Sequence, residues 1–287
     1  MSIESETLAL LADAAARLGG APRVRALILP PRRPDDSLAG ESCAIELDDG
    51  SIGLSYVLYG DALQRLHASS AAVAGADAPA LAQGFARDPA DDDGLPRTLG
   101  LAAANALTAW VYARCGWAPP PAGDSLAAID PQPGERVGMV GFFGPLVEPI
   151  LASGAALVVV ELRADLLGER QGVTVTADPD ALADCDKVLA TGTLLLNGTL
   201  ERMRAAARRA TRFALIGPSA GLLPDALFAA GVTDIGGSWV LNGPGFAEAL
   251  RCGERRGRNA RKFALGVSAY PGLSALLARA DAPPGRQ

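Results

Sequence analysis

Apolar residues in the first part of the chain recur at helical spacing over positions 8–18, which predicts a first helix with Ser5 as its N-cap. Further helices are expected at 61–73 and 98–115, and Thr98 is the expected cap of the last one. The last segment is rich in alanine and only weakly polar, but it is too short to span a bilayer.

Strand patterns lie between these helices. Residues 24–29 form a β-rich run, and apolar and polar residues alternate over 43–47 and 52–56. The sequence Asp-Asp-Gly-Ser at 48–51 separates the last two runs and predicts a hairpin. The first part of the chain, residues 1–122, therefore reads as a small α+β domain.

A proline-rich stretch at 117–135 separates this part from a different pattern. Five prolines in that window indicate a linker or a domain boundary. Beyond it, near-continuous apolar runs alternate with helical segments, which predicts a parallel sheet covered on both faces. We expect a Rossmann-like α/β domain over 130–280. Its expected strands are 136–142, 157–161, 187–190, 212–216, 232–235 and 238–241, and its expected helices are 145–153, 199–210 and 224–230.

The amino-acid composition excludes several classes of function. Of the 287 residues, 49% are hydrophobic and 20% are charged, so the chain can build a sizeable core. The net charge of −6 argues against a nucleic-acid-binding protein. With one histidine, two lysines and no GK[ST] motif, a multi-histidine zinc site and a Walker-A loop are excluded. The acidic N-terminus and the four scattered cysteines favour a cytoplasmic protein without membrane contact. The sequence is compatible with a monomer and with a homo-oligomer.

Three polar features have simple structural interpretations. The acidic segment 88–94 lacks the ligand spacing of a calcium loop and reads as a solvated turn. His67, late in an amphipathic helix, reads as a surface or interface residue. The basic segment 251–262 reads as a solvated loop, with docking of an acidic partner or nucleic acid as the alternative.

The strongest functional signal lies at the expected carboxyl ends of the parallel strands. Ligands bind at this edge of such sheets, where the strand ends meet. The segments there are rich in glycine, hydroxyl and amide groups, and one carboxylate is among them. The candidate ligand-binding residues are Gly141, Phe142, Phe143, Glu161, Thr191, Gly192, Thr193, Asn197 and Ser219. Asn105, a polar residue within the apolar helix, is either a brace between the domains or a further ligand contact.

Two interpretations of the first loop compete. Glu161 follows Gly141 by 20 residues, the separation expected of a carboxylate that binds a ribose hydroxyl. However, the glycines are spaced GxxGxxG, and Phe142 and Phe143 occupy the place where a pyrophosphate needs bare backbone. The alternative is a tight strand-to-helix turn with Glu161 at a strand end.

Several motifs in one order carry a family resemblance. They are Val137–Phe143, Thr191–Thr199, Gly217–Ser219, Phe228–Val232 and Gly236–Val240. Together they resemble the family of prokaryotic proteins labelled putative heavy-metal chelation domain, over about residues 135–270. Residues 100–107 resemble the end of the smaller domain that precedes it in this family, which is similar to the N-terminal domain of enolases.

The resemblance implies a two-domain protein with a ligand cleft between or beside the domains. It also implies an association with a heavy metal or a metal chelate, for which Glu161 is the only obvious charged ligand at the expected cleft. Since soft metals favour thiolate and imidazole, a metal–organic complex or an oxyanion fits these loops better than a bare ion. Three functions follow: a cytoplasmic small-ligand or metal-chelate binder, an enzyme with a nucleotide or S-adenosyl cofactor at the same edge, and a non-catalytic interaction module. Whether a reaction is catalysed stays open.

Overall fold

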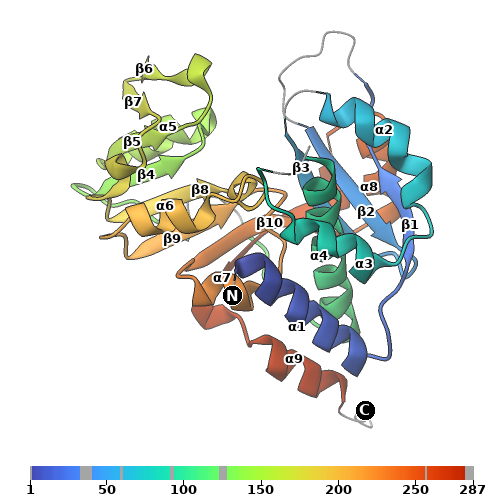
Figure 1. Ribbon diagram of the computed structural model, residues 1–287. Coiled ribbons are helices and arrows are strands. Elements are labelled where there is room, and N and C mark those ends of the chain that lie inside the picture. The colour runs from blue at the N-terminus through green and yellow to red at the C-terminus, as the bar shows by residue number, and fades with distance from the viewer. Residues whose placement is uncertain are drawn as a thin grey trace.

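The computed structural model describes residues 2–32, 41–58, 61–90, 94–122, 128–255 and 257–281. It has a three-stranded sheet and an eight-stranded sheet, with helices packed around both (Figure 1). The strands are β1 (Val24–Ile28), β2 (Glu41–Leu47), β3 (Ile52–Val57), β4 (Arg136–Val140), β5 (Ala156–Val160), β6 (Gly168–Arg170), β7 (Val173–Thr176), β8 (Lys187–Thr191), β9 (Arg212–Ile216), β10 (Asp234–Val240) and β11 (Ala260–Gly266).

The α-helices are α1 (Ile3–Arg17), α2 (Ala62–Val73), α3 (Ala78–Ala82), α4 (Leu95–Arg114), α5 (Gly144–Ala152), α6 (Leu200–Ala206), α7 (Pro224–Ala229), α8 (Gly243–Arg251) and α9 (Leu273–Ala280). Short 3-10 helices are η1 (Gln83–Ala86), η3 (Ala164–Leu166), η4 (Pro179–Leu182), η5 (Gly192–Leu195), η6 (Gly257–Asn259) and η7 (Val267–Ala269). Among the described residues, no helix combines the length and the apolar character that crossing a membrane requires.

The small sheet confirms the predicted hairpin. Strands β2 and β3 pair antiparallel, and β1 pairs antiparallel with β2. The turn between β2 and β3 is closed by Asp49, whose carboxylate accepts the backbone N–H of Ser51 at 3.0 Å and its hydroxyl at 2.8 Å. Such Asx contacts let aspartate hold a turn without help from other segments.

Helix α4 packs against this sheet at unusually close range. Its alanine-rich sequence is buried on almost every side, so no bulky side chain separates it from β3. A Cβ on Gly53 of β3 would lie 1.9 Å from the backbone nitrogen of Ala106 and 2.4 Å from the carbonyl oxygen of Ala102. The alanine run and this glycine are therefore a matched pair that lets the two backbones touch.

Two predicted helix caps are wrong by a few residues. Helix α1 begins at Ile3, and Ser2 is its N-cap because its hydroxyl accepts the N–H of Ser5. Helix α4 begins at Leu95 after Gly94, so Thr98 lies inside the first turn, where its hydroxyl donates to the Gly94 carbonyl at 2.6 Å. In both cases a residue nearer the N-terminus starts the helix, which moves the boundary by about one turn.

The large sheet has the order β11-β10-β9-β8-β4-β5-β7-β6. The six central strands are parallel to one another, whereas β11 and β6 are antiparallel edge strands. Counted along the chain, the six parallel strands follow the Rossmann order 3-2-1-4-5-6. The order reverses between β4 and β8, which places a topological switch point between their carboxyl ends.

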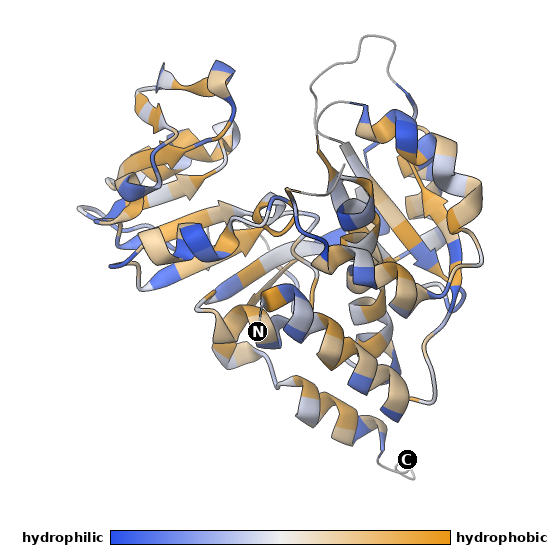
Figure 2. Cartoon of the chain, in the orientation of Figure 1, coloured by the Kyte–Doolittle hydropathy of each residue, from blue (hydrophilic) through white to orange (hydrophobic). Residues whose placement is uncertain are grey.

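Both faces of the large sheet are buried, as the near-continuous apolar runs predict. Met139 and Val159 belong to the apolar cluster on one face, together with Val147 and Ile150 of α5. Their neighbours along the strands, such as Val140, belong to the larger cluster on the opposite face. The strands β4 and β5 and helix α5 are correspondingly hydrophobic over most of their length in Figure 2.

The two parts of the chain share one apolar cluster. The larger apolar cluster contains Leu8, Leu11 and Leu101 from the first part of the chain and Leu215 and Leu227 from the second. Helix α1 packs against α7, so apolar surface is shared across the proposed boundary. The exact domain division stays a prediction, and residues 123–127 of the expected linker lie outside the described residues.

Several elements in the second part differ from the sequence prediction. The runs 232–235 and 238–241 form one strand, β10, because Gly236 and Gly237 continue the extended backbone beside β11. The basic segment 251–262 is not one solvated loop, since its last residues begin β11, although Arg256 lies outside the described residues. Strands β6, β7 and β11 and helices α3, α8 and α9 were not predicted. Residues 91–93 of the acidic segment also lie outside the described residues.

Candidate functional site

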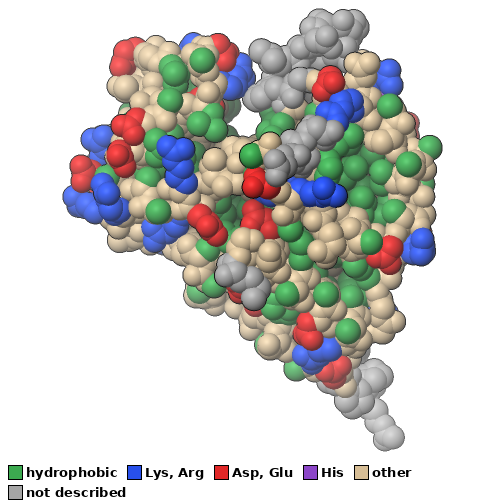
Figure 3. All heavy atoms as spheres, in the orientation of Figure 1, with side chains coloured by type: hydrophobic (Ala, Val, Ile, Leu, Met, Phe, Trp, Pro, Cys, Tyr) green, Lys and Arg blue, Asp and Glu red, His purple; other side chains and the backbone are tan. Residues whose placement is uncertain are grey.

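A cavity of about 410 Å³ lies at the topological switch point. Its walls come from the segments that follow β4, β5, β8 and β9, and from the end of β3 in the small sheet. Figure 3 shows the surface hollowed between the part that carries β5 to β7 and the part that carries β3 and α2. This volume is in the range of sites for small organic molecules.

The structure brings nine of the ten candidate residues together around this cavity. They are Gly141, Phe142, Phe143, Glu161, Thr191, Gly192, Thr193, Asn197 and Ser219. Asn105 does not line it. That a ligand contacts these residues stays a prediction, although the shared edge follows directly from the parallel topology.

The loop after β4 forms the aromatic wall. Gly141 adopts φ +86°, and a Cβ there would lie 3.0 Å from the Thr191 methyl group. Glycine thus allows the chain to leave β4 in a left-handed turn next to β8. The turn then places Phe142 and Phe143 at the cavity, with Phe143 as the residue before α5.

Glu161, at the end of β5, is already hydrogen-bonded three times by backbone. One carboxylate oxygen accepts the N–H of Phe142 at 3.0 Å, and the other accepts those of Leu162 at 2.7 Å and Arg163 at 3.0 Å. The carboxylate therefore fastens the loop after β4 to the loop after β5. It also occupies the Phe142 N–H that a pyrophosphate at this loop would use.

The segment after β8 supplies hydroxyl and amide groups. Thr191 accepts from the backbone N–H of Thr193 at 3.3 Å and from its hydroxyl at 3.1 Å. Asn197 accepts through Oδ1 from the backbone N–H of Thr199 at 3.2 Å and from its hydroxyl at 2.6 Å. These short-range bonds fix the loop locally, without contribution from a bound molecule.

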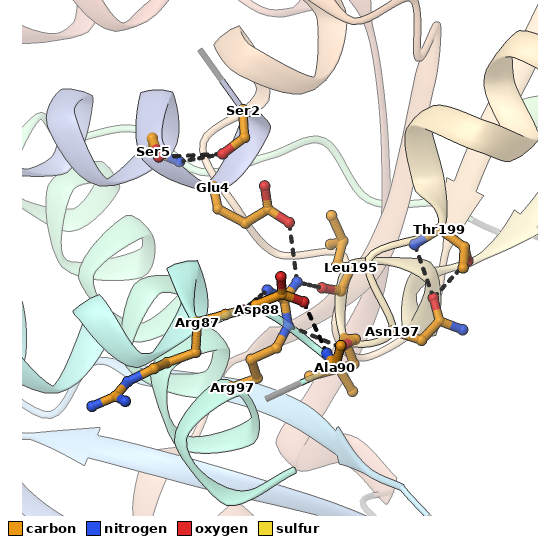
Figure 4. A network of polar contacts seen from close by, with 11 residues as sticks. Ser2, Glu4, Ser5, Arg87, Asp88, Ala90, Arg97, Leu195, Asn197 and Thr199 are labelled. Carbon is orange, nitrogen blue, oxygen red and sulfur yellow. Dashed lines mark hydrogen bonds and ion pairs between the residues drawn. The ribbon is translucent and has the colours of Figure 1, made fainter. Parts of the chain in front are cut away.

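Arg97 of α4 holds the same segment from behind. Its side chain is only 4% exposed, and its guanidinium donates to the carbonyls of Leu195 at 2.5 Å and Leu196 at 2.9 Å. It also pairs with Glu4 at 3.0 Å (Figure 4). The first part of the chain therefore positions the loop that presents Asn197, because a buried arginine needs all of these acceptors.

A second connection between the two sheets lies at Ser219, beyond β9. Its hydroxyl accepts the backbone N–H of Tyr56 at 2.9 Å. The Asn105 amide donates to the Ser219 carbonyl at 3.1 Å and to the Leu54 carbonyl at 2.6 Å, while Asn105 itself is 4% exposed. Asn105 thus braces the back of the cavity wall, which matches the first of its two interpretations.

Eleven further lining residues are not among the candidates predicted from the sequence. They are Tyr56, Leu58, Val140, Val160, Leu162, Arg163, Leu194, Thr199, Met203, Gly217 and Pro218. Tyr56 lies in β3 of the small sheet and Leu58 directly follows it, and no local signal connects that hairpin to the large sheet. Thr199, Gly217 and Pro218 are neighbours of predicted residues, so a wider reading of the same loops would have included them.

The donor set of the cavity does not fit a bare soft metal ion. Such ions favour thiolate and imidazole, yet the lining residues include neither cysteine nor histidine, and the only sulfur among them is the Met203 thioether. Within the described residues, no three or more His, Cys, Asp or Glu side chains gather closely enough to hold a metal. Burial raises the pKa of the Cys43 thiol to about 12, which disfavours the thiolate form that binds metals.

Two solved structures are similar to the whole chain. One, from Desulfitobacterium hafniense, has a TM-score of 0.66 and 19% identity, and the match covers 90% of this chain and 99% of that one. The other, from Pyrococcus horikoshii, has a TM-score of 0.60 and 18% identity, with 92% and 98% covered. Both are described as proteins of unknown function from the DUF364 family, and at this identity they establish the fold alone. The likeness to an enolase N-terminal domain stays a prediction.

A comparison with curated proteins gives no match. In contrast, the family model described as putative heavy-metal chelation, DUF364, matches residues 124–267. This range contains the whole parallel sheet and every loop at its carboxyl edge. The chain belongs to the putative heavy-metal chelation family.

Proposed function

We propose that the protein binds a small organic ligand in the switch-point cavity, and that any metal it handles arrives already held by such a ligand. The observation that carries this proposal is the composition of the cavity lining. Phe142 and Phe143 offer flat apolar surface, while Thr191, Asn197 and Ser219 offer hydrogen bonds from two other loops. Sites for organic molecules combine these two kinds of surface.

A ligand that carries its own metal would reconcile the family description with the chemistry of the cavity. The family is described by heavy-metal chelation, but the cavity lacks the ligands that a free soft ion requires. A metal chelate fits both observations, because its organic part supplies the ligands of the metal. The protein then contacts the carbon and oxygen atoms of that organic part. We place this activity in the cytoplasm, because Cys43, Cys115, Cys185 and Cys252 are all free thiols.

An enzyme with a nucleotide or S-adenosyl cofactor is the second candidate. The Rossmann strand order and the position of Glu161 at the end of the second parallel strand favour it. The three backbone hydrogen bonds to Glu161 weaken it, because a ribose hydroxyl would compete with them. Saturable quenching of tryptophan fluorescence by NADH or S-adenosylmethionine, lost in Glu161→Gln, would support this candidate.

Native mass spectrometry combined with elemental analysis tests the main proposal. The protein as purified is expected to carry an organic adduct, with any metal present only together with that adduct. Thr193→Phe places a ring in the cavity and should remove the adduct, whereas Thr174→Val, on the exposed face of β7, should retain it. A stoichiometric metal without organic mass, or an adduct that persists in Thr193→Phe, would contradict the proposal.

A further inference from the structure

The amide of Asn197 can present only hydrogen-bond donors to the cavity. Its Oδ1 accepts the backbone N–H of Thr199, and a backbone N–H can only donate, so the orientation of the amide is fixed. The Thr199 hydroxyl donates to the same oxygen at 2.6 Å. Figure 4 shows Nδ2 on the side away from Thr199, and no acceptor among the described residues meets it. Two N–H groups are therefore available to a ligand.

Two hydroxyl groups that line the same cavity also accept hydrogen bonds from the protein backbone. Thr191 Oγ1 receives the backbone N–H of Thr193, and Ser219 Oγ receives that of Tyr56. Each hydroxyl oxygen thus accepts a hydrogen bond from the protein, and its O–H group stays available to donate to a bound molecule. Ser219 is 1% exposed, so an unused donor there is costly.

Among the described residues that line the cavity, Glu161 is the one carboxylate, and its oxygens already accept hydrogen bonds. Glu161 already receives the backbone N–H groups of Phe142, Leu162 and Arg163. A ligand ammonium group would have to share its oxygens with these three donors. Arg163 also lines the cavity, and its guanidinium pairs with Asp165 at 2.6 Å.

We infer that the cavity selects a flat aromatic carboxylate, with its oxygens on Asn197, Thr191 and Ser219 and its ring on Phe142 and Phe143. The inference deepens the proposed function and rests on it. A carboxylate accepts several hydrogen bonds at once, which satisfies donors from the loops after β8 and β9 together. An amine of the same size brings further donors to a wall that already has too many.

Benzoate and benzylamine are suitable probes, because they share a ring and differ in the polar group. Two-dimensional ¹H–¹⁵N NMR of the full-length protein reports the side-chain amide of Asn197, which is identified as the pair of signals missing from Asn197→Asp. Benzoate should shift this pair in a saturable manner, and benzylamine should not.

Asn197→Asp is the decisive variant. It keeps an oxygen for Thr199 and replaces the two donors with a second oxygen, so benzoate should bind at least about tenfold more weakly. Asn242→Asp is the matched control, since Asn242 also accepts a backbone N–H, from Gly245 at 3.2 Å, but caps α8 on the surface. Its affinity for benzoate should equal that of the unchanged protein.

The outcomes separate this inference from the proposed function. If benzylamine shifts the cavity signals, and if Asn197→Asp strengthens its binding, the selection of a carboxylate is wrong although the cavity does bind aromatic molecules. If neither probe shifts any signal from the cavity, both the inference and the proposed site fail. Weaker benzoate binding in Asn242→Asp equal to that in Asn197→Asp would also overturn the inference.

Discussion

Asn105→Asp tests whether the amide of Asn105 joins the two sheets behind the cavity. The substitution keeps the shape of the side chain but removes the two donors that bind the carbonyls of Leu54, at 2.6 Å, and Ser219, at 3.1 Å. Each lost bond costs about 1–3 kcal/mol when a buried acceptor stays unpaired. We therefore expect a decrease of about 2–6 kcal/mol in the free energy of unfolding, a large share of the usual 5–15 kcal/mol.

Urea unfolding followed by circular dichroism measures this decrease. Asn242→Asp on the surface is the control, because aspartate caps a helix as well as asparagine does, and it should change stability by less than about 0.5 kcal/mol. Burial opposite two carbonyls raises the pKa of a carboxyl at position 105 above its unfolded value. The deficit should therefore grow as the pH rises through that raised pKa. A deficit within 0.5 kcal/mol of the control, on the same scale of surface effects, would refute the brace.

Three further predictions concern other parts of the fold. Gly53→Ala places a Cβ 1.9 Å from the backbone nitrogen of Ala106 and should lower the free energy of unfolding in urea by at least about 1–3 kcal/mol. Gly243→Ala, whose Cβ meets nothing closer than 3.5 Å, should not lower it. Equal effects of the two substitutions would contradict the close packing of α4. Lys187 lies 2.8 Å from Glu135 and lowers the pKa of this carboxyl, so the charged carboxylate stabilises the fold above its ordinary pKa of 4.5. The stability advantage of the unchanged protein over Glu135→Gln should be complete at neutral pH and should disappear as the pH falls below 4.5. An advantage that is independent of pH would refute the pairing. Iodoacetamide should modify exposed Cys252 first in the native protein, although Glu248 raises its pKa, and modification of buried Cys43 at a similar rate would show that its strand opens.

The sequence predicts those parallel strands that are continuous apolar runs, which both faces of the sheet bury, but not β7, in which valine alternates with threonine. Val137–Val140 and Leu157–Val160 show this pattern without ambiguity. The missed elements carry conflicting local signals. Helix α8 begins with Gly-Pro-Gly at 243–245, and β11 begins with basic residues that suggest a loop. Their buried positions, such as Phe246 and Phe263, become apparent only against the neighbouring strands.

The candidate site follows from topology and not from a motif. Once β4, β5, β8 and β9 are taken as parallel, their following loops must meet at one edge, and the nine lining residues come from those loops. The contribution of Tyr56 and the support from Arg97 could not be predicted, since both depend on how α4 and the small sheet pack against the large one. Contacts over such sequence distances leave no periodic pattern.

The proposed function requires that metal enters the cavity only as part of an organic complex. Anomalous diffraction from crystals soaked with copper(II) alone, and with copper(II) and one equivalent of salicylate, tests this claim directly. We expect an anomalous peak beside Phe142 and Asn197 only when salicylate is present, with the salicylate ring against the aromatic wall. A copper peak in the cavity without salicylate, or a copper–salicylate complex bound only elsewhere, would contradict it.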